Sequence, residues 1–220
     1  MFDAYESITP EEDVTIMTRT EFIRNYWNYY LALENRVLQT TNYIELHPAN
    51  ENAFSNEYAI LMQAIGGELD SFFKQYCDFC PTDRKTIADY AVYILTDYPD
   101  IKKQSITVIG TDLTITPFAK WNTEQANQSL FWWAAYNNIK HSRYMNKKYA
   151  SQNNVLNILG ALYLVEMKYL QKITANLEQP DVPDNVSKLF SLNDWIYHYI
   201  PINNYMAVIN GDITILDNND

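Results

Sequence analysis

Glycine is scarce in this chain, with 5 residues among 220. Neither the GxGxxG nor the GxxxxGK[ST] spacing occurs, which excludes the glycine-rich phosphate cradles of dinucleotide-binding and P-loop proteins. Positive charge is also scarce, because 16 Lys and Arg stand against 27 Asp and Glu and leave a net charge of −11. Nucleic acids and anionic membranes repel a molecule of this charge as a whole.

Cysteine is almost absent, and Cys77 and Cys80 form a single CxxC pair. A structural zinc site needs about four ligands, and no second CxxC or HxxxH pair occurs. A thioredoxin-like motif opens a helix after a strand, whereas this pair follows a helical pattern and precedes Pro81. We expect two reduced thiols at a helix end, no metal and no cofactor, with redox or metal chemistry as the alternative.

Long apolar runs are missing as well. The most apolar stretch, residues 155–170, contains Asn157, Gly160 and Glu166 and is shorter than the roughly 20 apolar residues of a membrane span. Residues 1–13 are acidic and lack the apolar centre of a secretory signal. Together with the low cysteine content, this predicts a cytoplasmic protein without a membrane partner, in which residues 155–170 form a buried helix.

Apolar side chains make up 47% of the chain, which is enough for a sizeable core in one large domain. They recur at the helical spacing of three and four residues. Thr18 and Glu21 form a capping box, and Ser55 is a typical first cap residue. Helices are therefore predicted over residues 18–46, 55–72, 84–95, 124–144 and 152–177, with a short one at 186–190.

Two segments alternate apolar and polar residues instead, which is typical of strands. They lie at residues 104–117 and 205–217, and Asn210-Gly211 in the second is a strong hairpin signal. The predicted fold is mainly α: an antiparallel helical bundle with two small β-hairpins. We expect one domain over residues 1–220, with residues 1–17 as an N-terminal arm.

The charges are unevenly distributed along the chain. Residues 125–165 contain no Asp or Glu, yet they include Lys140, Arg143, Lys147 and Lys148. A basic patch on an acidic protein predicts an anionic ligand or partner. The alternative is that these cations pair with acidic neighbours inside the bundle.

At about 100° per residue, Asn137, Lys140 and His141 fall on one face of the predicted helix. Imidazole can transfer protons near neutral pH, an amide can orient a ligand, and an ammonium group can neutralise a phosphate. This set suits phosphodiester chemistry. A structural role for His141 is the alternative, because His47 and His198 show no partner pattern.

Residues 132–143, which read WWAAYNNIKHSR, resemble the signature helix of the HEPN-like bacterial proteins. Residues 153–159 and the long N-terminal helix pair are similar to that family too. Its active members are helical bundles that carry Arg-Asn-x-x-x-His, cleave RNA without a metal and usually dimerise, so that two motifs share one cleft. The resemblance implies an RNA- or nucleotide-binding protein with Asn137 and His141 as catalytic residues, in phage defence or a toxin–antitoxin system.

The motif departs from the family at Tyr136, which stands where the arginine belongs. Lys140 or Arg143 could replace that cation, although lysine lacks the planar fork of arginine. The phosphate or ligand site would then comprise Tyr136, Lys140, Arg143, Lys147 and Lys148. A homodimer is expected, because one histidine cannot supply both acid and base, whereas two-fold symmetry supplies a second copy.

The sequence is also compatible with two other interpretations. A non-catalytic interaction or scaffold protein could use the basic helix to bind a protein partner or to form a homodimer. In addition, residues 195–205 are rich in Trp and Tyr and could either line a small-molecule pocket or pack in the core.

Overall fold

The structure is a computed structural model that describes residues 17–175, 181–193, 197–199, 205–209 and 212–216. Almost all of the predicted N-terminal arm and the side chains of the aromatic segment at 195–205 lie outside the described residues. The mainly α fold is confirmed. The helices are α1 (Arg19–Phe22), α2 (Asn28–Thr40), α3 (Asn56–Tyr76), α4 (Ile87–Asp97), α5 (Ala126–Ser129), α6 (Phe131–Ser142) and α7 (Gln152–Thr174).

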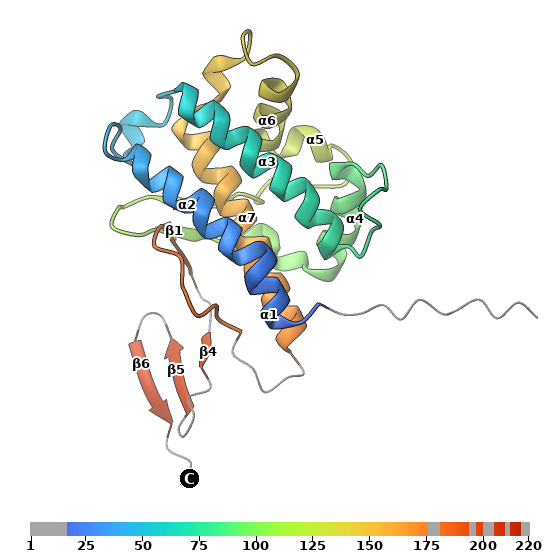
Figure 1. The fold of residues 1–220 in the computed structure, drawn as a ribbon, viewed down its shortest axis with the longest axis vertical. Helices are drawn as coiled ribbons and strands as arrows, with labels where there is room; N and C mark the ends of the chain where they lie inside the picture. Colours follow the sequence, from blue (N-terminus) through green and yellow to red (C-terminus); the bar gives the residue numbers. More distant parts are fainter. Residues whose placement is uncertain (1–16, 176–180, 194–196, 200–204, 210–211, 217–220) are drawn as a thin grey trace, which may run out of the picture.

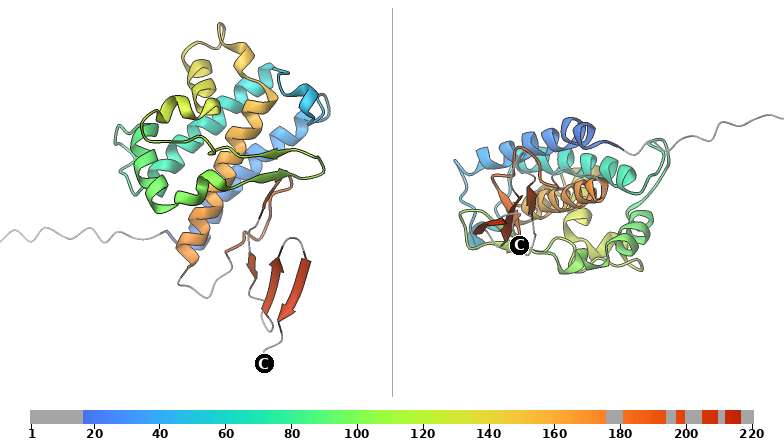
Figure 2. Two further views of the ribbon diagram at one scale, coloured as in Figure 1. Left: turned by 180° about the vertical axis from the view of Figure 1, so that it is seen from behind. Right: turned by 90° about the horizontal axis from the view of Figure 1, so that it is seen from below.

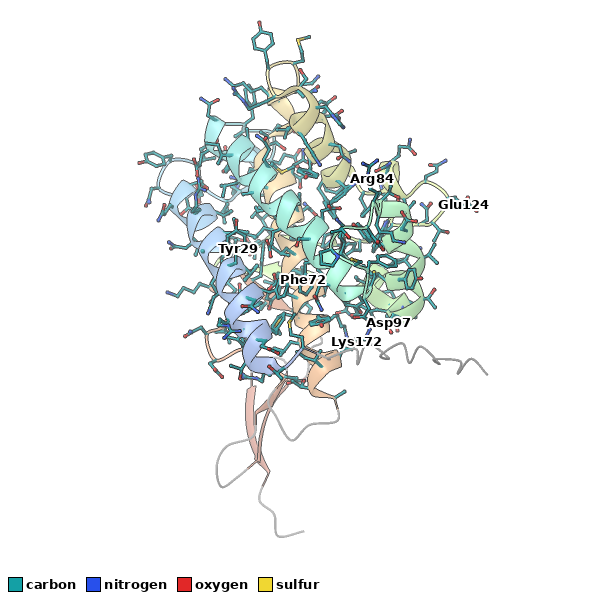
Figure 3. All side chains as sticks on the ribbon, turned by 45° about the vertical axis from the view of Figure 1, so that its right-hand side comes forward. Tyr29, Phe72, Arg84, Asp97, Glu124 and Lys172 are labelled. Carbon is teal, nitrogen blue, oxygen red and sulfur yellow. The ribbon has the colours of Figure 1, made fainter. Side chains whose placement is uncertain are left out.

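Helix α7 is the centre of the bundle, and α2, α3 and α6 pack around it (Figures 1 and 2). Every residue of α7 from Val155 to Met167 is buried, which confirms the predicted core helix. Near its C-terminal end, the Lys172 ammonium group lies 3.2 Å from the Asp97 carboxylate of α4 (Figure 3). Among the described helices, none combines the length and apolar character needed to cross a membrane.

Helix starts follow the predicted caps more closely than helix ends do. The Thr18 amide donates to the Glu21 carboxylate at 2.9 Å, and the Ser55 hydroxyl accepts from the Tyr58 amide at 3.0 Å. The first helical segment contains a π turn at Ile23–Trp27 and ends at Thr40, so its prediction to residue 46 was too long.

Two other predicted helices have shifted bounds. Helix α4 begins at Ile87 instead of residue 84, because a capping box of Thr86 and Asp89 defines its start. The predicted helix at 124–144 is divided into α5 and α6 by Leu130, whose backbone is extended. Just after this break, the Trp132 indole donates to the Pro117 carbonyl at 2.8 Å.

The first predicted hairpin is present and belongs to a larger sheet. Strand β1 (Ile106–Val108) pairs antiparallel with β2 (Thr114–Ile115), with Ile106 opposite Ile115. On its other edge, β1 pairs with β3 (Phe190–Leu192), with Val108 opposite Phe190. The short helix predicted at 186–190 is therefore wrong, since this segment leads into a strand.

Glu34 explains why that segment is not helical. The buried Glu34 carboxylate accepts from the backbone amides of Lys188 and Leu189 at 3.0 and 3.3 Å. It also accepts from the Tyr30 hydroxyl at 2.8 Å and from the Ser187 hydroxyl. These contacts occupy amides that a helix would direct to its own carbonyls, and they fix the segment against α2.

Glu34→Ala is expected to lower the free energy of unfolding by about 3 kcal/mol, because it leaves buried hydroxyl and amide donors without an acceptor. Urea unfolding followed by circular dichroism measures this loss. Glu124→Ala is the matched control at an exposed glutamate (Figure 3), and it should change stability by less than about 0.5 kcal/mol. Equal effects of the two substitutions would contradict the role of Glu34.

A second sheet follows at the C-terminal end of the chain. It comprises β4 (Tyr197–Tyr199), β5 (Tyr205–Ile209) and β6 (Asp212–Leu216), all antiparallel neighbours in this order. The predicted hairpin corresponds to β5 and β6, with Ile209 opposite Asp212. The residues of its Asn-Gly turn lie outside the described ranges.

Candidate functional site

Helix α6 approaches α3 closely at Gly66. A Cβ atom on Gly66 would lie 2.3 Å from Cδ2 of the Tyr136 ring, so only glycine leaves room for this side chain. Tyr136 is 4% exposed and packs against Trp133, with their ring centroids 5.2 Å apart. The structure therefore places Tyr136 in the core between the two helices. Of the other predicted site residues, Lys140 contacts Tyr136, and its ammonium group lies 5.3 Å from the centre of the Tyr136 ring.

The next face of α6 lines a surface cavity of about 520 Å³. Asn137, Lys140 and His141 all contribute to its wall, so the structure brings these three predicted residues together. The remaining walls come from α3, the start of α4 and α5, and their residues are Asp70, Lys85, Thr86, Ile87, Asn127 and Gln128.

The polar groups of this α6 face are available to a ligand. His141 and Lys140 are exposed, and Asn137 is half-buried. Within the part of the chain that the structure describes, no hydrogen bond or ion pair engages the His141 imidazole, the Lys140 ammonium group or the Asn137 amide. His141 is therefore neither buried nor hydrogen-bonded among the described residues.

One carboxylate and one further cation face the same cavity. Asp70 accepts a hydrogen bond from the Tyr90 hydroxyl at 3.1 Å. Burial, followed by the Asp70 charge, raises the pKa of Tyr90, which therefore remains a neutral donor. The Lys85 ammonium group lies 3.8 Å from the Asp83 carboxylate and 4.3 Å from the centre of the Phe79 ring. The cavity thus combines cations with a single carboxylate that already holds a donor.

The other predicted cations lie beyond the end of α6. Arg143, Lys147 and Lys148 are exposed on the segment between α6 and α7, at the top of the molecule in Figure 1. Like Lys140, none of them forms an ion pair with any carboxylate in the described ranges. The alternative that these cations pair with acidic neighbours inside the bundle is therefore contradicted.

Sequence reasoning missed the far walls of the cavity. Asp70 and Lys85 belong to elements that are distant from α6 along the chain, and no motif connects them to His141. His47 is occupied elsewhere, because its Nδ1 accepts from the Ala49 amide at 3.1 Å. The His198 side chain lies outside the described residues. Among the described residues that line the cavity, Asp70 is the carboxylate and His141 is the imidazole.

The two cysteines lie at and just after the C-terminal end of α3. Both are reduced thiols; Cys77 is buried at the end of α3, and Cys80 is exposed. Burial raises the pKa of Cys77 to about 12, which keeps its thiol protonated and unreactive. Among the residues that the structure describes, no cluster of three or more His, Cys, Asp or Glu side chains could hold a metal ion.

The α6 site thus presents an imidazole, an amide and cations that have no carboxylate partner among the described residues, on a protein whose net charge is strongly negative. Comparison of the chain with family models, curated proteins and solved structures finds no match.

Proposed function

We propose that this protein binds RNA through α6 and the segment that follows it. The observation that carries the proposal is a group of cations, Lys140, Arg143, Lys147 and Lys148, that form no ion pair within the described residues of a chain with a net charge of −11. Cations that an acidic protein leaves without carboxylate partners are available to an anion. The resemblance of residues 132–143 to the HEPN signature helix favours RNA among the anions, and such a role belongs in the cytoplasm.

Each residue then has a chemical role. Lys140 and Arg143 neutralise phosphates at the end of α6, and the Asn137 amide bonds to a phosphate oxygen or a ribose hydroxyl. Lys147 and Lys148 extend the cationic surface in the direction of the bound RNA strand. Tyr136 has no direct role in this proposal, because its ring is buried against Gly66.

Binding should depend on these cations and on salt. Charge reversal by Lys140→Glu with Arg143→Glu is expected to weaken binding of a fluorescein-labelled RNA by at least about tenfold and to reduce the salt slope by about two. Fluorescence anisotropy over a salt series measures both quantities.

The matched control for that experiment is Lys102→Glu with Lys120→Glu. It makes the same change in net charge at two exposed lysines that do not line the cavity. The control should reduce affinity much less than the site variant. Equal losses would show that only the total charge matters, and a parent protein without affinity for RNA would refute the proposal.

Metal-independent cleavage of the RNA is the second candidate, and His141 is the observation that favours it. The imidazole is exposed, unbonded within the described chain and beside Asn137 and Lys140. As a base it would take the proton of a ribose 2′-hydroxyl, whose oxygen bonds to the adjacent phosphorus as the bond to the 5′-oxygen breaks. An acid must then protonate that 5′-oxygen, and His141 of a second copy in a homodimer would supply this proton.

Cleavage is tested with labelled RNA in the presence of EDTA, comparing the parent protein with His141→Ala. Loss of cleavage with retained binding would support catalysis by His141. Binding without any cleavage by the parent would instead favour the non-catalytic alternative, in which the same helix serves only to bind a partner.

A further inference from the structure

The segment from Arg143 to Tyr149, called here the tip, exposes large apolar side chains. Tyr144 is 87% exposed, Met145 72% and Tyr149 36%. Hydration of such side chains is unfavourable, so exposed apolar patches commonly mark binding surfaces. None of these three takes part in the proposed contacts of α6 with phosphate.

Hydrogen bonds at both ends hold the tip in place. The backbone N–H of Asn146 donates to the Ser142 carbonyl at 3.1 Å, and the Asn146 side-chain amide donates to the Asn138 carbonyl at 2.8 Å. On the other side, the Asn154 side chain donates to the Tyr149 carbonyl at 2.8 Å. A loop that is fixed before binding loses little conformational entropy when a ligand arrives.

Cations alternate with the exposed rings along the tip. Arg143 precedes Tyr144, and the Lys148 ammonium group lies 5.4 Å from the centre of the Tyr149 ring. No Asp or Glu occurs in residues 125–165, and the neighbouring loop includes Glu51, whose backbone carbonyl accepts from the Asn153 amide. Rings for stacking beside cations for phosphates are the two features that bind single-stranded nucleic acids.

We propose that the tip selects single-stranded RNA, with unpaired bases stacking on Tyr144 while Arg143, Lys147 and Lys148 contact the flanking phosphates. This inference rests on the proposed RNA binding and adds the class of RNA. In an A-form duplex the base faces are covered by their neighbours, and the deep major groove does not admit side chains. A duplex would therefore contact the cations and leave Tyr144 without a stacked base.

The test compares two fluorescein-labelled RNAs of equal length, one unstructured and one fully paired, by anisotropy with the full chain. The parent is expected to bind the unpaired RNA at least about tenfold more tightly than the duplex at equal salt. Tyr144→Ala should weaken binding of the unpaired RNA by about tenfold and leave duplex binding unchanged, whereas Tyr144→Phe should retain the preference.

Tyr29→Ala is the matched control, because Tyr29 is an exposed tyrosine of α2 and lies outside the tip (Figure 3). This variant should bind both RNAs as the parent does. Since Tyr144 projects from a loop into solvent, its substitution is not expected to unfold the protein, and circular dichroism checks this.

The outcomes separate the two proposals. Equal affinity for both RNAs, or an unchanged affinity of Tyr144→Ala for the unpaired RNA, would overturn the selection by the tip while the loss on charge reversal at Lys140 and Arg143 still supports RNA binding. Failure of the parent to bind either RNA would overturn both proposals and leave the tip as a surface for a protein partner.

Discussion

Glu166→Gln is expected to reduce the loss of stability that the parent protein shows as the pH rises above the ordinary pKa of a glutamate. Glu166 lies in α7 with 0% of its surface exposed, and neither carboxyl oxygen has a hydrogen-bond partner among the described residues. Burial, with a further contribution from the Glu68 charge, raises the pKa of Glu166 well above its ordinary value. The folded protein therefore keeps this carboxyl protonated and neutral.

The direction of the pH effect follows from linkage. Above the ordinary pKa near 4.3, the unfolded chain releases the Glu166 proton while the folded protein retains it. The free energy of unfolding then falls by about 1.4 kcal/mol per pH unit until the folded pKa is reached. The stabilising contribution is thus complete in acid and is lost as the pH rises. Glutamine has no proton to lose, so the variant should lose less stability than the parent as the pH rises above the ordinary carboxyl pKa.

Urea unfolding at a series of pH values measures this difference, and Glu124→Gln is the control at an exposed carboxyl. Burial also raises the pKa of Glu68, so the Glu166 variant should keep a smaller slope of the same sign. Parallel pH curves for the parent and Glu166→Gln would show that Glu166 is ionised and hydrated in the folded protein.

Local hydrogen bonds explain which parts of the fold could be predicted. Thr18 with Glu21, and Ser55 with the Tyr58 amide, are contacts between residues three apart, so the sequence alone contains both partners. The end at Thr40 and the break at Leu130 have no such local signal. The break at Leu130 lies beside the hydrogen bond from Trp132 to Pro117, which are 15 residues apart along the chain. The periodic pattern of apolar residues does not reveal a contact over that separation.

Strand β3 could not be predicted for a related reason. Five residues at 186–190 are too few for periodicity to distinguish a helix from a strand. Their conformation is fixed by Glu34, which is more than 150 residues away along the chain. Glu34 lies within a predicted helix, and nothing in the sequence around it indicated that its carboxylate would accept hydrogen bonds from distant backbone amides.

The candidate site shows the same division. Asn137, Lys140 and His141 belong to one helix, so the helical period was sufficient to place them on one wall of the cavity. Asp70 and Lys85 come from other elements, and only the packing of α3, α4 and α6 brings them there. Tyr136 is the residue directly before Asn137. Neighbouring side chains on a helix point about 100° apart, so the Tyr136 ring is directed into the core while Asn137 lines the cavity.

Gly66→Ala is expected to destabilise the protein by about 2 kcal/mol, although alanine is the better helix former by about 1 kcal/mol. The added Cβ would lie 2.3 to 2.6 Å from three ring atoms of Tyr136. That ring is buried and packed against Trp133, so relief requires a shift of α6 itself. Because α6 forms one wall of the site, the variant should also bind RNA more weakly if the proposed function holds.

Gly67→Ala is the matched control in the same helix, since a Cβ at Gly67 meets no atom within 4 Å. This control should stabilise the protein by up to about 1 kcal/mol through helix propensity alone. Tyr136→Ala added to Gly66→Ala should cost less than the sum of the two single changes, because the ring that clashes is then gone. The prediction would be contradicted if Gly66→Ala and Gly67→Ala shifted the urea midpoint in the same direction. The close approach of α3 and α6 would then not require a glycine at position 66.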